Sequence, residues 1–243
     1  MAQFFVTAEQ LAGEMICLSG EQAIHAKVLR LKAGETVTLC DGVTQECVCV
    51  VDSVNDGDYL MRVLERKSIS TEPDVKASVY MAFSKGDKLE HVIQKATELG
   101  AYEIVTFPSA RCISRPDEKS LRNKLERWQK IAVSAAEQSG RGLIPQVVYV
   151  NSYKEALKRG AAADKAILFY ENEHATTLKM ALTEADFTTV SLLTGPEGGL
   201  EEKEVAEARE AGFDICTLGR RILRCETAPL CALSVLMYAT GEF

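Results

Sequence analysis

The sequence predicts an α/β protein in which a mostly parallel sheet, with helices on both faces, follows a small β-rich module. From residue 75 onward, apolar runs of strand length alternate with segments whose apolar residues follow helical spacing. Before residue 72, clusters of β-forming residues are separated by short turn signals. A chain of 243 residues is long enough to bury the core of one large domain or of two modest ones.

The N-terminal part, residues 1–72, is predicted to be a small barrel-like module with one helix. Asp41-Gly42 and Asp56-Gly57 are residue pairs typical of the turns between antiparallel strands. A polar segment that ends in Pro73 predicts a linker from residue 68, which divides the chain into domains 1–72 and 73–243. The strands are expected over residues 35–40, 46–54 and 59–64, and the helix over residues 21–29.

The C-terminal part, residues 73–243, carries the alternation of strands and helices that predicts the parallel sheet. Gly100 has the position of a helix C-cap, and Ser152 with Glu155 has the spacing of a capping box. The expected strands cover residues 75–83, 103–107, 146–150, 166–170, 190–193 and 213–217. The expected helices cover residues 89–99, 118–138, 175–182 and 201–211, with one more opening at residue 152 and one reaching the C-terminus.

Composition and charge argue against several classes of protein. No apolar run approaches the length of about 18 residues that a membrane span needs, and the N-terminus lacks the features of a signal peptide, so we expect a cytoplasmic protein. The eight cysteines form no CxxC pair and the three histidines have no ligand spacing, which predicts that no metal is bound. The net charge of −7 argues against binding nucleic acid through bulk positive charge.

A polyanion would therefore have to meet local basic patches. One candidate stretch runs from Arg111 to Arg141 and contains several lysines and arginines. Acidic residues are interspersed among these cations, as on a solvated helix face. Both interpretations stay open from this segment alone.

The most informative segments are two turns near the C-terminus, each between a strand-like run and a helix-like run. The first, Thr194 to Leu200, reads TGPEGGL and matches neither the GxxxxGK nor the GxGxxG phosphate-binding pattern. Its proline between glycines fixes a rigid turn, which is either structural or part of a ligand site. Two glycine-containing turns at neighbouring strand ends are where an open α/β sheet builds its ligand crevice, so the C-terminal half is an enzyme candidate.

The second segment, Leu218 to Ala228, reads LGRRILRCETA. It places three arginines and Glu226 around an apolar pair, just before a helix. Arginine forks suit phosphate and carbonyl oxygens, which indicates a binding or catalytic loop. The alternative is a structural ion pair between Arg224 and Glu226.

Together these two segments resemble the 16S rRNA uridine-N3 methyltransferase family, of the RsmE type within the SPOUT superfamily. Earlier segments resemble the same family: His25 with VLR at residues 28–30, the Lys-rich helix that ends in ELG at residues 98–100, and EQS-R at residues 137–141. The resemblance covers nearly the whole chain in order. Cys225 and Cys112 stand where Thr and Ser are expected.

The resemblance implies a PUA-like RNA-binding β-barrel over residues 1–72 and a SPOUT methyltransferase domain with a deep C-terminal trefoil knot over residues 73–243. It also implies a homodimer that binds S-adenosylmethionine and methylates N3 of a specific uridine in 16S rRNA of the small ribosomal subunit. The cofactor cradle would lie at the strand end 169–171, at the first turn and in the second. Its residues would be Phe169, Leu193, Thr194, Gly195, Glu197, Gly198, Gly199, Leu218, Gly219, Ile222 and Leu223.

The chemistry of uridine methylation assigns roles to the second turn. Uracil N3 is a weak acid that must lose its proton as it attacks, and the charge then spreads onto O2 and O4. Arg221 and Arg224 suit the stabilisation of that charge, and either Glu226 or Glu197 could act as a base. We favour arginine stabilisation, with the base unassigned and with Glu226 as the third candidate catalytic residue.

Contacts to RNA phosphates would come from basic side chains on both domains. Two alternatives remain: the same scaffold could methylate a ribose hydroxyl or a tRNA base, or the chain could be a non-catalytic RNA-binding assembly factor. The two intact turns argue against the assembly factor, because a pure binding module has no use for them. The candidate RNA-binding residues are Arg30, Lys85, Lys88, Arg111, Arg115 and Arg141.

Overall fold

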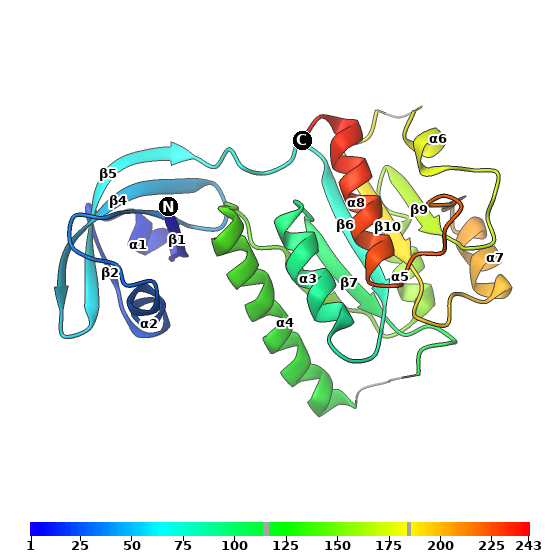
Figure 1. The fold of residues 1–243 in the computed structure, drawn as a ribbon, viewed down its shortest axis with the longest axis horizontal. Coiled ribbons are helices and arrows are strands. Elements are labelled where there is room, and N and C mark those ends of the chain that lie inside the picture. The colour runs from blue at the N-terminus through cyan, green and yellow to red at the C-terminus, as the bar shows by residue number, and fades with distance from the viewer. Residues whose placement is uncertain (114–116, 184–185) are drawn as a thin grey trace. The chain divides into compact units, whose positions relative to one another are not determined.

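The computed structural model describes residues 1–113, 117–183 and 186–243. The chain divides into two compact units (Figure 1). The first contains Met1–Glu72 and Ala136–Ile144, and the second contains Pro73–Ala135 and Pro145–Phe243. Within the described ranges, no helix combines the length and the apolar character required to cross a membrane.

The N-terminal unit is built on a five-stranded sheet of order β1-β3-β4-β5-β2. Strands β1 and β3 are parallel, and the other pairs are antiparallel. The inward side chains form a closed apolar core that includes the fully buried Phe4, Leu18 and Met61. The elements are β1 Ala2–Phe5, α1 Ala8–Leu11, β2 Met15–Leu18, α2 Gly20–Val28, β3 Thr36–Cys40, β4 Gln45–Asn55 and β5 Asp58–Ser68.

Both predicted turns of this unit are confirmed. The Asp41 carboxylate accepts the backbone N–H groups of Val43 and Thr44, each at 2.8 Å, and so closes the turn between β3 and β4. Asp56 and Gly57 adopt φ values of 50° and 93°, the left-handed pair that a two-residue hairpin turn requires. The sequence did not predict β1, α1 and β2, because four-residue elements carry too little periodicity to be recognised.

The segment Ala136–Ile144 packs with the N-terminal unit although it follows Pro73 in the chain. Arg141 is only 5% exposed, and its Nε donates to the Glu72 carboxylate at 3.2 Å. The backbone N–H of Gly142 donates to the Thr71 hydroxyl at 2.9 Å. A guanidinium that is buried and paired in this way is held inside the protein, so the predicted phosphate contact of Arg141 is replaced by a structural role.

The C-terminal unit contains a six-stranded, wholly parallel sheet of order β11-β9-β10-β6-β7-β8. Its strands are β6 Lys76–Ala82, β7 Glu103–Phe107, β8 Gln146–Tyr149, β9 Lys165–Phe169, β10 Thr189–Thr194 and β11 Asp214–Cys216. Its helices are α3 Lys88–Glu98, α4 Glu118–Ser139, α5 Tyr153–Gly160, α6 Leu178–Thr183, α7 Glu202–Glu210 and α8 Thr227–Thr240.

Helices cover both faces of this sheet, as predicted. Helices α3 and α8 pack together on one face of the central strands, and α5 packs on the other (Figure 1). The central strands are consequently buried on both sides, and Val79, Ile167 and Leu192 have no exposed surface. The strand order places the carboxyl ends of β9, β10 and β11 side by side at one edge of the fold.

Two local predictions need correction. Helix α6 begins at Leu178, three residues later than expected, because the Glu173 carboxylate binds the N–H groups of Ala175 and Thr176 and holds them out of the helix. At the start of α5, the Ser152 hydroxyl accepts the Glu155 N–H at 3.1 Å. The Glu155 carboxylate, however, accepts from Asn151 instead of Ser152, so the capping box is only half formed.

Candidate functional site

A cavity of about 720 Å³ opens beyond the carboxyl ends of β9, β10 and β11. Three segments line it, each following one of these strands: residues 169–172, 194–200 and 217–226. Lys88, the first residue of α3, completes the wall. This is the position at which open parallel sheets bind ligands, and the volume is within the usual range of small-molecule sites.

The turn after β10 is held in place by one hydrogen bond within it and one from outside it. The N–H of Gly199 donates to the carbonyl of Pro196 at 3.0 Å, and Nη1 of Arg111 donates to the carbonyl of Gly198 at 3.0 Å. Gly199 has φ +69°, and a Cβ at this position would overlap the carboxylate of Glu171. The backbone conformation therefore favours glycine, and a larger residue would have to push the Glu171 carboxylate aside.

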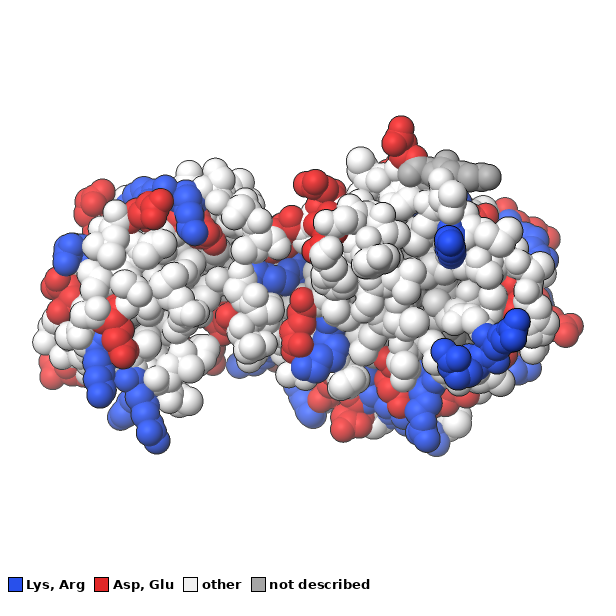
Figure 2. All heavy atoms as spheres, turned by 45° about the horizontal axis from the view of Figure 1, so that its top comes forward, with Lys and Arg blue, Asp and Glu red and all other residues white. Residues whose placement is uncertain are grey.

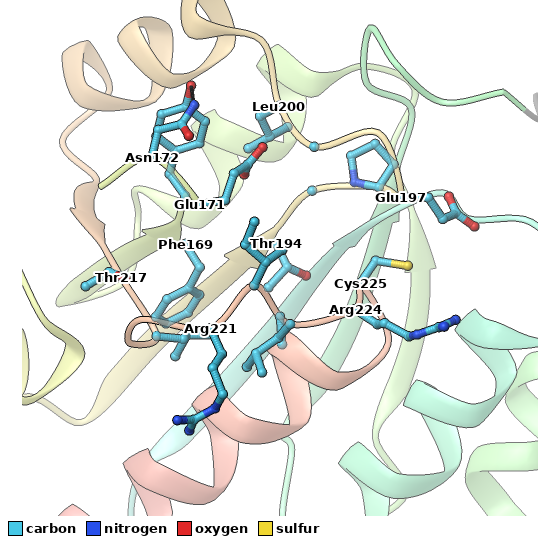
Figure 3. Close-up of a pocket in the computed structure, with 18 of the residues that line it drawn as sticks. Phe169, Glu171, Asn172, Thr194, Glu197, Leu200, Thr217, Arg221, Arg224 and Cys225 are labelled. Carbon is cyan, nitrogen blue, oxygen red and sulfur yellow. Dashed lines mark hydrogen bonds between the residues drawn. The ribbon is translucent and has the colours of Figure 1, made fainter. Parts of the chain in front are cut away.

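The segment after β11 leads from the sheet into α8. The Thr217 hydroxyl accepts the N–H of Gly219 at 3.2 Å, and the Arg224 carbonyl accepts the N–H of Thr227 at 2.9 Å. Between these two hydrogen bonds the side chains of Arg221, Ile222 and Arg224 are exposed, and Ile222 is 84% exposed. Figure 3 shows that Arg221 and Arg224 extend in different directions from this segment.

The two sides of the cavity differ in chemistry. Phe169 and Thr217 lie on one side, and Glu197, Cys225 and Arg224 lie on the other (Figure 3). On the second side, Nζ of Lys88 donates to the Glu197 carboxylate at 3.0 Å. The first side therefore combines the Phe169 ring with polar side chains, whereas the second holds the ion pair of Lys88 and Glu197.

Both candidate bases are stabilised as carboxylates. For Glu197, burial works to raise the pKa, but its own backbone amide and Lys88 outweigh that effect, so the pKa is lowered. For Glu226, burial again works to raise the pKa, but its own backbone amide and the thiol of Cys225 outweigh that effect, so the pKa is lowered. The Cys225 sulfur lies 3.2 Å from the Glu226 carboxylate. A carboxylate with a lowered pKa is a weak proton acceptor, which argues against either as general base.

The thiol of Cys225 stays neutral beside these charges. Burial, the hydrogen bond to Glu226 and the field of Glu197 raise its pKa to about 12. It therefore acts as a hydrogen-bond donor to Glu226, the role that the hydroxyl expected at this position would also fill.

The structure brings the predicted catalytic and cofactor residues to this one cavity, with one exception. Leu193 belongs to β10, and its side chain has no exposed surface, so it supports the site from the sheet core. Asn172, His174 and Leu200 also line the cavity and were not predicted. The signal that could have found Asn172 and His174 is their position just after β9, where the same strand-end rule applies.

The predicted RNA-binding residues lie in different settings. Arg30 is exposed and follows α2 with φ +59°. Arg111 braces Gly198, and Lys88 lies in the cavity wall instead of on open surface. The backbone N–H of Lys85 donates to Glu197 at 3.0 Å, and Arg115 lies outside the described residues.

Comparison with known proteins identifies two family models along the chain. The model of an RNA methyltransferase domain matches residues 71–237, and that of an RNA methyltransferase PUA domain matches residues 18–64. The chain is 36% identical to the ribosomal RNA small subunit methyltransferase E of Bacillus subtilis, over 99% of this chain and 97% of the relative.

Two solved structures are similar over nearly their whole length. One is a ribosomal RNA small subunit methyltransferase E from Neisseria gonorrhoeae bound to S-adenosylmethionine, with a TM-score of 0.86, 31% identity and coverage of 98% of this chain and 97% of that chain. The other is a Legionella pneumophila methyltransferase structure that contains the same cofactor, with a TM-score of 0.86, 30% identity and the same coverage. The chain therefore belongs to the ribosomal RNA small subunit methyltransferase E family.

Proposed function

We propose that this protein transfers a methyl group from S-adenosylmethionine to N3 of a uridine in the 16S rRNA of the small ribosomal subunit. The observation that carries the proposal is the cavity at the strand ends, where both glycine-containing turns meet. Family membership supports the reaction class, and the two related structures that contain S-adenosylmethionine support the cofactor.

The cavity residues fit this cofactor. Phe169 and Leu218 offer an apolar surface for a nucleoside, and Gly195, Gly198 and Gly199 line the same cavity with backbone. When bound, S-adenosylmethionine supplies an activated methyl group on a sulfonium centre. The candidate cofactor residues are Phe169, Thr194, Gly195, Glu197, Gly198, Gly199, Leu218, Gly219, Ile222 and Leu223, with Leu193 as their support.

The cationic side chains of the cavity would meet the uracil. As N3 loses its proton, negative charge spreads onto O2 and O4, and cations placed beforehand lower the barrier. Arg221 and Arg224 supply such cations, while the Glu226 carboxylate is stabilised by the thiol of Cys225 and by the charges of Lys88 and Arg224. The low pKa of both glutamates favours arginine stabilisation over a carboxylate base.

RNA would be held by local basic groups on both units. On the face shown in Figure 2, Lys and Arg side chains lie among Asp and Glu instead of forming one continuous basic surface. Arg30 on the N-terminal unit and Lys85 on the C-terminal unit are candidates, and we propose residues 1–72 as a PUA-like RNA-binding barrel. Shape as well as sequence would then select the site on the ribosomal subunit.

Three further features belong to the same proposal. We propose the C-terminal trefoil knot that the family resemblance implies; in the structure, α8 returns from the edge strand β11 to pack on β6 and β10. We also infer a homodimer, since α8 presents Val235 and Tyr238 as exposed apolar side chains one turn apart. An enzyme that modifies ribosomal subunits would act in the cytoplasm.

The deciding experiment follows labelled methyl from S-adenosylmethionine into small ribosomal subunits that lack the modification, with naked 16S rRNA and tRNA in parallel. We expect 3-methyluridine, identified by mass spectrometry, in 16S rRNA. A different methylated base or ribose would overturn the specificity, and the absence of cofactor binding would favour the assembly-factor alternative.

A further inference from the structure

Lys88 is tied to the cavity by a contact that joins two distant parts of the chain. The Glu197 carboxylate accepts from Nζ of Lys88 at 3.0 Å and from the backbone N–H of Lys85 at 3.0 Å. Glu197 belongs to the turn after β10, whereas Lys85 lies in the connection between β6 and α3, and Lys88 is the first residue of α3. The contact therefore fixes the first turn of α3 against the cavity wall.

The ammonium group of Lys88 is charged and directed by this contact. The hydrogen bond to Glu197 raises the pKa of Lys88 above its usual range, against the effect of burial, and the negative charges of Glu197 and Glu226 raise it further. Its side chain is 31% exposed, so most of its surface is covered. Among the described residues, Glu197 is its only hydrogen-bond acceptor, and two of its three N–H groups are left for a ligand.

Within residues 1–113, 117–183 and 186–243, no hydrogen bond or ion pair holds the side chains of the neighbouring Arg221 and Arg224 in this way. Arg221 and Arg224 are exposed and extend in different directions from their segment (Figure 3). A long, solvated side chain must be ordered before it can stabilise charge, whereas a group that is already held in place does not incur that cost. Lys88 is therefore the cation that the cavity holds most firmly.

We propose that Lys88 is a catalytic residue whose ammonium group donates to a uracil oxygen, and that Glu197 is the positioning residue that holds it there. The inference rests on the proposed uridine methylation. In the step concerned, the N3–H bond breaks, the proton passes to water, and the electron pair stays on the ring, spread over O2 and O4. Lys88 remains protonated throughout and stabilises that anion.

This role differs from the phosphate contact that the sequence suggests for Lys88. A lysine that contacts phosphate supplies affinity and salt dependence, because it displaces counterions when RNA binds. A lysine that stabilises developing charge supplies rate at saturating RNA. The two roles therefore predict opposite results in the same pair of measurements.

The first test compares Lys88→Met with Lys95→Met in the full-length protein. Lys95 lies on the same helix and pairs with Glu98 at 2.7 Å, but it does not line the cavity, so it is a matched control. We expect Lys88→Met to slow the single-turnover rate at saturating cofactor and RNA by about 100-fold, as for the loss of one oxyanion donor. RNA affinity and its salt dependence should change little, and Lys95→Met should match the wild type.

A near-normal single-turnover rate for Lys88→Met would overturn the proposal. So would a rate lost only through weaker RNA binding, with the salt slope reduced by about one unit, which is the signature of a phosphate contact. Calorimetric binding of S-adenosylmethionine reports whether the variant is folded. Lys88→Arg, which keeps the charge, should recover part of the rate.

A second test uses RNA in which 5-fluorouridine replaces the target uridine. Fluorine makes N3 more acidic, so less external stabilisation of the anion is needed. We expect the fluorine substitution to raise the single-turnover rate of Lys88→Met about tenfold more than it raises the rate of the wild type. An equal effect on both proteins would show that Lys88 acts only on structure and would overturn its catalytic role.

The positioning role of Glu197 is tested by a double-mutant cycle. Glu197→Ala should slow the single-turnover rate, and adding it to Lys88→Met should slow the reaction little further, because both changes remove the same interaction. Additive losses would overturn the positioning role. If the wild type forms 3-methyluridine and Lys88→Met is unimpaired, the inference about Lys88 alone is overturned. If the wild type forms a different product, the proposed function is overturned as well.

Discussion

The two ends of strands β9 and β10 show opposite uses of polar groups. At their amino ends, the Asp164 carboxylate accepts the backbone N–H groups of Thr188 and Thr189, each at 2.9 Å, and the Thr188 hydroxyl at 3.0 Å. The N–H of Asp164 in turn donates to the Thr189 hydroxyl at 2.9 Å. Polar groups at this end satisfy one another within the chain.

At their carboxyl ends, the same strands open into the cavity. The turn that follows Thr194 exposes backbone around Gly199, and Lys88 keeps donors beyond the one that it gives to Glu197. The difference shows where this fold places stability and where it places binding capacity. Changes at the carboxyl ends should therefore impair reaction and ligand affinity, and changes at the amino ends should impair folding.

The largest effect is expected for Arg224→Ala. Removing a cation that faces the developing charge should slow single-turnover methylation by roughly 100- to 1000-fold at saturating cofactor. Arg209→Ala, an exposed arginine on α7 outside the cavity, is the control and should leave the rate unchanged. Near-normal turnover by Arg224→Ala would remove arginine stabilisation from the mechanism.

A smaller loss, in cofactor affinity, is expected for Gly199→Ala. A left-handed φ costs a non-glycine residue about 1–2 kcal/mol of folding stability. At Gly199 the added Cβ would in addition displace the carboxylate of Glu171, which lines the cavity, and this displacement is what weakens binding of the ligand. We expect calorimetry to show S-adenosylmethionine binding weakened by roughly 10- to 30-fold. The matched control is Gly212→Ala. Gly212 has φ +97° and lies away from the cavity, and no atom lies within 4 Å of the position that its Cβ would take, so this change should lower stability without the loss of affinity. Equal affinity losses in the two variants would contradict the comparison.

Leu218→Ala should weaken cofactor binding by about tenfold, since roughly 1–2 kcal/mol of apolar contact is removed from the cavity wall. Ile222→Ala should weaken it less, because this side chain is 84% exposed. The same calorimetric titration measures both. A ranking in which Ile222→Ala is the more damaging change would mean that the segment after β11 closes over the ligand.

The smallest effect, and one confined to stability, is expected for Asp164→Asn. Hydrogen bonds from Thr188 and Thr189 lower the pKa of Asp164 to about 2 from its ordinary 3.8. Its contribution to the free energy of unfolding is thus complete above pH 3.8 and is lost as the pH falls through 2. Thermal unfolding should give Asp164→Asn a Tm a few degrees below that of the wild type at pH 7. The difference in Tm should become smaller between pH 4 and pH 2. A gap that does not depend on pH would contradict this assignment.

The long elements were predictable because each one carries its own periodicity. Strands such as β7 and β10 are apolar runs bounded by turn residues, and α4 keeps one apolar face over its length. The short elements of the N-terminal unit and the late start of α6 were not predictable. They depend on partners such as Glu173, whose hydrogen bonds compete with helix formation.

The sequence by itself determined the class of fold, the two turns that line the cavity, and the resemblance that pointed to the family. These features are local, since strand and helix periods and turn chemistry act over a few neighbouring residues. Only the tertiary structure decided that Arg141 is buried against Glu72 and that Lys88 lies in the cavity wall against Glu197. Each of these pairs joins residues far apart in the chain, and the protonation and availability of a charged group depend on the neighbours that folding brings to it.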